Sequence, residues 1–142
     1  MPRINVELQD AAELEIAPEG EYDLRIVKAE DGESKKGNEM TTLTLAFEGH
    51  PEWQPLKHWV LYPSADMEKN QRAMRVVEIK RLLVCFNVEH DEAGFDSDGL
   101  VGQVGRSLVI QEEADDGNTY NRLKLPRLRK SDERAERSRI RR

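Results

Sequence analysis

The fold is decided near the start of the chain by residues 18–49, PEGEYDLRIVKAEDGESKKGNEMTTLTLAFEG. In each half of this stretch apolar side chains occupy alternate positions: Tyr22, Leu24 and Ile26 in the first, and Leu43, Leu45 and Phe47 in the second. Such alternation predicts two strands that each turn one face to a hydrophobic core. The polar stretch 31–38 contains two glycines and an asparagine, which predicts the loop between the strands.

The rest of the chain predicts three more strands and one helix. Residues 56–62 form a third strand, which follows a loop containing two prolines. Within residues 64–87 the apolar positions recur in steps of three and four: Val76, Ile79, Leu82, Leu83 and Phe86. This spacing predicts an amphipathic helix, with Ser64 as its N-cap and Asn87 at its end. Residues 106–114 and 119–128 flank a turn that contains Asp-Gly, which predicts a hairpin of two final strands.

Three strands, a helix and a two-strand hairpin indicate a mainly β fold. This is the element order of an OB-fold, a five-stranded Greek-key barrel with one helix between strands 3 and 4. At 142 residues we expect one domain. We divide the chain into an acidic leader (residues 1–17), the OB-fold domain (18–128) and a flexible basic tail (129–142).

The charges are unevenly distributed along the chain. Residues 127–142 hold eight basic and three acidic side chains, a balance of +5, which leaves −11 for the rest of a chain whose net charge is −6. A basic arm on an acidic body is typical of proteins that contact polyanions. Two interpretations of the arm stay open, a phosphate-contacting segment and a solvated segment with its own acid–base pairs.

Several function classes lack the residues that they need. The single cysteine, Cys85, stands in the apolar run LLVCFNV, which predicts a buried structural thiol and fits a reducing, cytoplasmic compartment. His50, His58 and His90 lack the spacing of a zinc site, and phosphate-loop and dinucleotide glycine patterns are absent from the sequence. We therefore expect no enzyme, no metal and no cofactor, and no stretch is apolar enough for a membrane span.

Two predicted strands combine aromatic and cationic side chains on one face. Lys57 and Trp59 share a face of the third strand, and Tyr120, Arg122 and Lys124 share a face of the last. Sites for single-stranded nucleic acid need aromatic faces for the bases and cations for the phosphates. Trp59 is either such a platform or a core residue, and Trp53, in a proline-bounded loop, is either a stacking residue or a packing lid.

Further cations extend this candidate site along the first hairpin and beyond the last strand. Arg25 and Lys28 lie on the first strand, and Lys35 and Lys36 lie in its loop, which together form a basic track. The expected site therefore consists of Arg25, Lys28, Lys35, Lys36, Trp53, Lys57, Trp59, Tyr120, Arg122, Lys124 and Arg127.

From Ile16 to Pro126 the chain resembles a family of phage and prophage single-stranded DNA-binding proteins with an OB-fold. The resemblance is carried, in order, by PEGEYDLRIVKAE, SKKGNEMTTLTLAFEG, KHWVLY, IKRLLVCFNV, DSDGLVGQVGRSLVI and NTYNRLKLP. It implies that the protein coats single-stranded DNA during phage replication or recombination, without sequence specificity or cofactors, in the host cytoplasm. Replication or recombination proteins and further copies of the chain are candidate partners.

The end of the chain departs from this family. Many such proteins end in an acidic tail that recruits partners, whereas this chain ends in ERAERSRIRR. We expect the arginines to contact phosphates and to add salt dependence through counterion release. The alternative function is a non-enzymatic interaction or assembly module that uses the barrel as a scaffold and the charged tail for docking.

Overall fold

The computed structural model describes residues 3–6, 8 and 13–128. The elements follow in the order β1 (Gly20–Glu33), β2 (Glu39–Phe47), β3 (Leu56–Leu61), α1 (Lys69–Cys85), the 3-10 turn η1 (Ser97–Gly99), β4 (Val104–Glu113) and β5 (Thr119–Lys124). This is the predicted order. The predicted basic tail, 129–142, lies outside the described residues, as does part of the leader.

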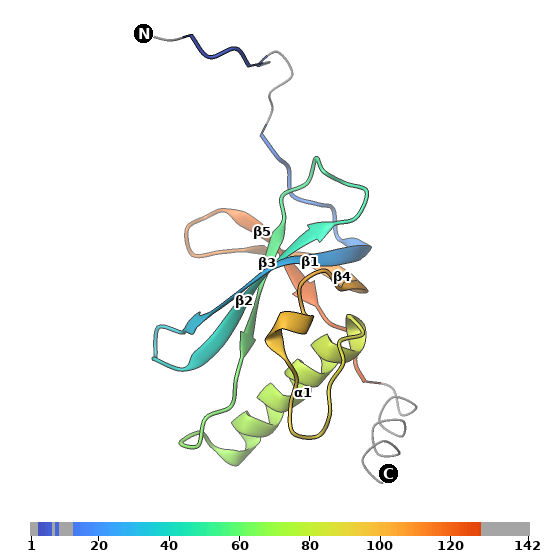
Figure 1. Ribbon diagram of the computed structural model, residues 1–142. Coiled ribbons are helices and arrows are strands. Elements are labelled where there is room, and N and C mark those ends of the chain that lie inside the picture. The colour runs from blue at the N-terminus through green and yellow to red at the C-terminus, as the bar shows by residue number, and fades with distance from the viewer. Residues whose placement is uncertain (1–2, 7, 9–12, 129–142) are drawn as a thin grey trace.

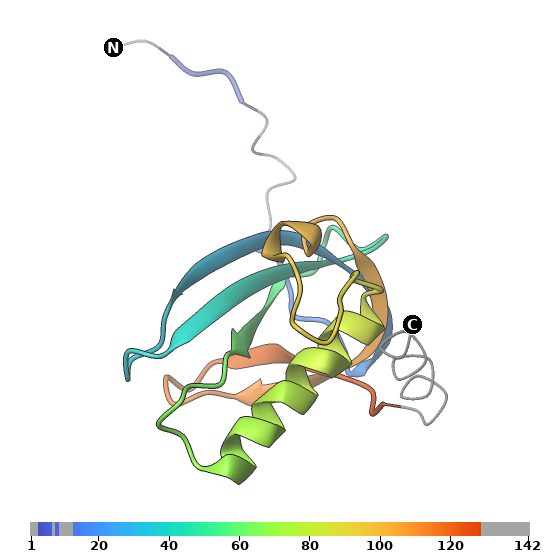
Figure 2. The same cartoon turned by 60° about the horizontal axis from the view of Figure 1, so that its bottom comes forward.

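The five strands form one antiparallel sheet in the order β3-β2-β1-β4-β5 (Figure 1). The long strand β1 joins its two halves, because Gly20–Arg25 pair with β4 while the residues from Leu24 onward pair with β2. A register shift between Ile26 and Lys28 marks a bulge, which bends a strand and increases its twist. The sheet therefore curls (Figure 2). The mainly β class with one helix is confirmed, but the sheet is not closed into a barrel by pairing between β3 and β5, both of which are fully described.

The core lies inside the curl, and the predicted alternation of the first two strands is confirmed. Its buried side chains come from β1 to β4 and from the end of the helix: Leu24, Ile26, Leu43, Leu45, Phe47, Leu56, Val60, Leu82, Leu83, Phe86 and Val109. From β5, Leu123 packs against them partly buried. The helix packs closely on β4 at Gly105, where a Cβ atom would lie 2.6 Å from the carbonyl oxygen of Cys85. Cys85 is only partly buried, whereas the sequence predicted a buried thiol. Burial nevertheless raises the pKa of this thiol to about 11.

The helix differs from its prediction at the beginning and agrees at the end. It begins at Lys69 with Glu68 as the N-cap, because the Ser64 hydroxyl instead donates to the carboxylate of Asp66 within the preceding loop. Val76, predicted for the apolar face, is 52% exposed, since all fully buried residues of α1 lie in its last turns. Asn87 ends the helix as predicted, in the left-handed conformation with φ 53°.

The loops and strand ends shift by a few residues. The first loop is shorter than predicted, because β1 continues to Glu33 and the turn is closed by a 2.7 Å bond from the Ser34 N–H to the Asn38 carbonyl. The predicted Asp-Gly turn is confirmed, with Gly117 at φ 84°. β5 ends at Lys124 instead of residue 128, two residues before Pro126, which cannot donate to a ladder.

Residues 15–17, assigned above to the leader, are fixed to the sheet. The Glu15 N–H donates to the Glu52 carbonyl at 3.1 Å, and the Gln54 N–H donates to the Glu15 carbonyl at 2.7 Å. Ala17 is fully buried, and its N–H and carbonyl bond the Asn121 amide at 2.8 and 2.9 Å. This segment therefore connects the loop before β3 to β5, across the seam that strand pairing leaves open.

Candidate functional site

A groove of about 390 Å³ opens on the seam between β3 and β5. Four of the residues that line it belong to the predicted site: Lys57, Trp59, Tyr120 and Arg122. Ile16 and Pro55 add apolar surface at one end, and Asn121 is held by its bonds to Ala17. The seam thus brings together the aromatic and cationic residues of two strands that are distant in sequence.

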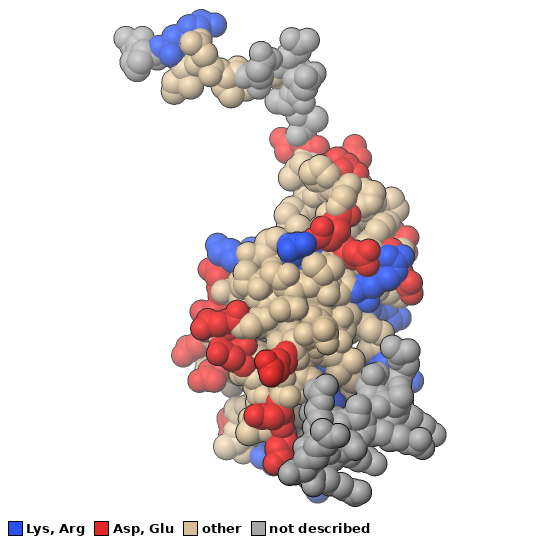
Figure 3. Space-filling model, turned by 45° about the vertical axis from the view of Figure 1, so that its right-hand side comes forward, with Lys and Arg blue, Asp and Glu red and all other residues tan. Residues whose placement is uncertain are grey.

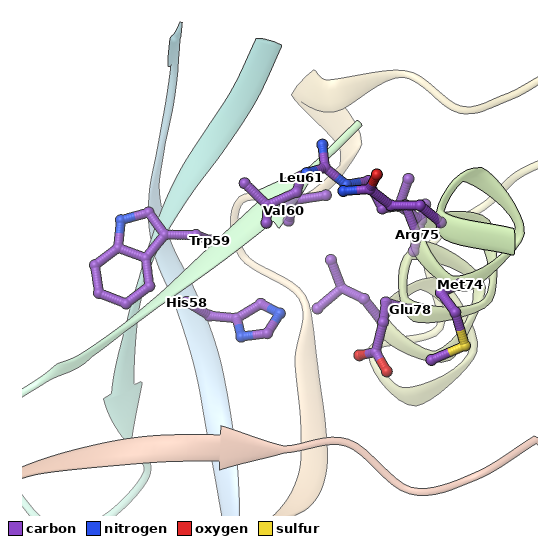
Figure 4. A pocket seen from close by; sticks show the side chains of 10 residues that line it. His58, Trp59, Val60, Leu61, Met74, Arg75 and Glu78 are labelled. Carbon is purple, nitrogen blue, oxygen red and sulfur yellow. The ribbon is translucent and has the colours of Figure 1, made fainter. Parts of the chain in front are cut away.

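Trp59 lies on the outer face of β3. The strand alternates, so that Leu56 and Val60 are buried, while Lys57 and Trp59 point outward. Trp59 is 41% exposed, whereas Val60 is 4% exposed. Figure 4 shows the indole on the side of β3 away from α1, with the His58 ring directed toward the helix. Of the two interpretations of Trp59, the structure shows the exposed aromatic face and not the core residue.

Arg122 lies between the two aromatic rings of the groove. Its guanidinium carbon is 5.2 Å from the ring centre of Trp59 and 5.2 Å from that of Tyr120, which is within the range of cation–π attraction. The Tyr120 hydroxyl donates to the Asp116 carboxylate at 2.7 Å, and this hydrogen bond is the main cause that lowers the pKa of Asp116. A cation therefore covers both aromatic faces, and one of the two rings is anchored by the adjacent turn.

The outer face beside the groove continues over β2 and β1 in two cross-strand rows. Lys57 pairs with Thr44, which pairs with Lys28, and Trp59 pairs with Thr42. Two steps between neighbouring strands place the Lys57 and Lys28 backbones about 10 Å apart. Lys28 also forms an ion pair with Glu30 at 3.0 Å. Sequence analysis did not single out the two threonines: Thr44 lies between the two lysines, whereas Thr42 lies between Trp59 and Glu30.

Trp53 packs against other aromatic rings of the domain and is not exposed as a stacking residue. It is half-buried in an aromatic cluster, stacked on His50 with ring centres 3.9 Å apart and in edge contact with Tyr22 and Phe47. Arg25 is also separate from the groove, because it forms an ion pair with Glu48 near the end of β2. Trp53 is therefore a packing lid, and Arg25 is neutralised locally.

The two hairpin turns flank the groove with opposite charges. Lys35 and Lys36 are exposed at the turn between β1 and β2, and the β4–β5 hairpin carries four carboxylates: Glu112, Glu113, Asp115 and Asp116. Both turns project on the same side of the sheet (Figures 1 and 2). On the face in Figure 3, acidic and basic side chains are interspersed with large uncharged areas. No broad basic surface appears on this face among the residues that are described.

A second hollow of about 280 Å³ lies between β3 and α1 (Figure 4), and Trp59 and Leu61 also line it, together with His58 and Val60. His58 projects into it, opposite Met74 and Glu78 of the helix. Burial lowers the pKa of His58 to about 4, so the imidazole is neutral at physiological pH. This pocket is mainly apolar and lacks the stacked cation of the groove.

The last two predicted site residues, Lys124 and Arg127, lie in a third hollow of about 710 Å³. The end of α1 and the start of β4 line the same hollow with Arg81 and Arg106, which sequence analysis did not single out. No sequence pattern could have found these two arginines, because they come from different elements and meet only through the packing of α1 on the sheet.

In residues 3–6, 8 and 13–128, no group of three histidine, cysteine or acidic side chains is arranged to hold a metal ion. The helices of that part of the chain include none with the length and apolar character needed to cross a bilayer. No protein-family model matches the chain, and no curated protein matches it.

Proposed function

We propose that this domain binds single-stranded nucleic acid in the groove between β3 and β5 and on the adjoining face of β2 and β3. One observation carries the proposal: Trp59 is exposed on the outer face of β3, and the Arg122 guanidinium covers its ring. An exposed tryptophan gives a base a face on which to stack, and every base has such a face. Tyr120 and Lys57 complete the combination of ring and cation.

In this mechanism the strand replaces the guanidinium on the indole. A base stacks on Trp59, and Arg122 turns from the ring to a phosphate, so the cation–π contact of the free protein is exchanged for an ion pair. Lys57 and Lys28, which lie on either side of Thr44, approach further phosphates of the strand. Stacking contributes about 1–3 kcal/mol per base, and phosphate neutralisation adds a salt-dependent share. The mechanism involves no covalent step.

The proposal includes an OB-type fold whose barrel is left open at the seam between β3 and β5. The strand order, the helix between β3 and β4, and the hairpin turns on one side of the sheet support it. In OB-folds, the face of strands 2 and 3 and the loops joining strands 1–2 and 4–5 bind oligonucleotides. The resemblance to phage proteins extends the proposal to coating of single-stranded DNA in replication or recombination, in the host cytoplasm.

The test uses the two tryptophans as separate reporters. In Trp53→Phe, Trp59 is the only tryptophan, and we expect saturable quenching by an oligo-dT strand that weakens with salt and survives competition by duplex DNA. In the matched variant Trp59→Phe, Trp53 reports from the aromatic cluster and should change little. Absence of quenching in Trp53→Phe, together with absence of a gel shift of the unmodified protein, would overturn the proposal.

The second candidate function is an interaction module, and the acidic β4–β5 hairpin favours it. Its four carboxylates stand at one side of the groove and would repel a nucleic acid while attracting a basic protein surface. The double variant Glu112→Gln/Glu113→Gln separates the two functions. It should strengthen oligo-dT binding if a strand is the ligand, and it should weaken capture of a lysine-rich peptide if the hairpin docks a basic partner.

A further inference from the structure

We propose that the third hollow, between the end of α1, the start of β4 and the end of β5, is a binding site for a phosphate group. Four cations from three segments of the chain line it, Arg81, Arg106, Lys124 and Arg127, with Glu21 as the one carboxylate in the lining. This is a concentration of positive charge on a body whose net charge is strongly negative. Guanidinium and ammonium groups of this kind recognise phosphate oxygens by charge-assisted hydrogen bonds.

Arg81 supplies the observation that points to a ligand. Its Nη1 donates to Glu78 at 2.9 Å, and its side chain is 24% exposed. Its Nε atom is buried, yet it has no hydrogen-bond partner among the described residues. A buried donor without an acceptor is unfavourable. Because Arg81 lines the hollow, a turn of its guanidinium toward an anionic oxygen there would give this donor a partner. The helix thus holds a guanidinium in place with one donor unused.

The carboxylates nearby leave part of the charge free. Arg106 is shared between Glu21 at 3.7 Å and Asp23 at 3.3 Å, so it is largely neutralised. Lys124 and Arg127, in contrast, form no ion pair within the described part of the chain. Two cations without an ion pair in residues 13–128, together with the Arg81 guanidinium, suit one tetrahedral anion, which presents more oxygens than a carboxylate does.

The size and position of the hollow favour a phosphodiester over an isolated phosphate. Its volume of about 710 Å³ leaves room for groups attached to the phosphate. Lys124 follows Arg122 by two residues on the same face of β5, a distance of about 7 Å along the strand. A nucleic-acid backbone that leaves the groove at Arg122 would therefore reach the hollow along β5. This extension to a strand rests on the proposed function, whereas the phosphate site does not.

The first measurement follows the Nε–Hε signal of Arg81 by NMR in the full chain. Inorganic phosphate should shift this signal saturably, beyond the effect of sodium chloride at equal ionic strength. Arg81→Gln should lower phosphate affinity about tenfold by calorimetry, while Arg72→Gln, an exposed position on the same helix, should leave it unchanged. Lys124→Gln/Arg127→Gln tests the same hollow without changing the helix, in case Arg81→Gln fails to fold.

The ligand's source is decided by repeating the measurement with oligo-dT. Two results would support a phosphodiester of the strand as the ligand. Oligo-dT should also shift the Arg81 signal, and Lys124→Gln/Arg127→Gln should lower the salt slope of oligo-dT binding by about 0.7 per lost contact. If only inorganic phosphate shifts the Arg81 signal, the site stands and the strand path is overturned. A shift with phosphate, combined with neither quenching of Trp59 nor a gel shift by oligo-dT, would overturn the proposed function alone. No shift with phosphate, and a double variant that behaves like Arg72→Gln, would overturn the site.

Discussion

The two faces of β3 line hollows of opposite character. On the outer face, Lys57 and Trp59 border a groove with a stacked guanidinium, and on the inner face His58 borders an apolar pocket against α1. The residues are neighbours in sequence, but the alternation of a strand places them in different environments. Changes on the inner face should therefore alter stability, and changes on the outer face should alter binding. Four predictions test this separation.

The largest effect is expected on stability, from the protonation of His58 on the inner face at acidic pH. The pKa of His58 is about 4 in the folded protein and about 6.5 when the chain is unfolded, so between these values the unfolded state binds the extra proton. The free energy of unfolding should therefore fall as the pH falls from about 6.5 to about 4, by about 3 kcal/mol in total from this residue. Urea unfolding of the wild type at about pH 7 and about pH 4 measures the loss.

The variant His58→Leu isolates that contribution. Leucine does not titrate, so its stability should fall less over the same pH range, and the difference between the two profiles is the contribution of His58. Strand affinity at neutral pH should stay the same, because His58 faces away from the groove. Parallel pH profiles for wild type and variant would contradict the burial of His58 as the cause.

The second effect belongs to the outer face. Trp59→Ala should weaken oligo-dT binding by about tenfold or more, because a stacked base contributes about 1–3 kcal/mol. Leu61→Ala is the matched control, since Leu61 lies on the same face two residues away and is 38% exposed, against 41% for Trp59. Both variants should unfold cooperatively in urea. Equal losses of affinity in the two variants would mean that Trp59 has no specific role.

The separation of these two faces was predictable from sequence. A half-buried strand has a period of two, and Val60 beside Trp59 favoured the outward placement of Trp59, although the sequence left a core position open as well. The same reasoning placed Leu24, Ile26 and the β2 residues correctly, because apolar burial dominates their positions. Asn87 was also predictable, since asparagine is one of the few residues that tolerate a positive φ at a helix end.

The contents of the groove and of the third hollow were only partly predictable. The Lys57–Thr44–Lys28 row depends on strand register, and the register changes at the bulge in β1. The attachment of Ala17 to Asn121 joins residues 104 positions apart through side-chain bonds that leave no local pattern. The helix start was missed because Ser64 bonds Asp66, a competing local interaction that the capping rule does not see.

The third prediction tests the role of Arg122, the cation stacked on the rings of the outer face. Arg122→Gln loses one phosphate partner, so the salt slope of oligo-dT binding should decrease by about 0.7, with a modest loss of affinity at low salt. Because the guanidinium no longer covers Trp59, quenching at saturation should be at least as large as in the wild type. Fluorescence titrations over a salt series measure both quantities. An unchanged slope would show that Arg122 stays on the rings in the complex.

The smallest effect tests whether Tyr120 acts through its ring or its hydroxyl. Tyr120→Phe removes the bond to Asp116 but keeps the aromatic face next to Arg122, so strand affinity should stay within about twofold of the wild type. The pKa of Asp116 should rise toward its ordinary value, because that hydrogen bond is the main cause of its lowering. NMR titration of the Asp116 carboxyl carbon measures the rise in the free protein. A larger loss of affinity would mean that the turn positions the ring through its hydroxyl, so that the acidic hairpin, otherwise unfavourable to a polyanion, helps to build the groove beside it.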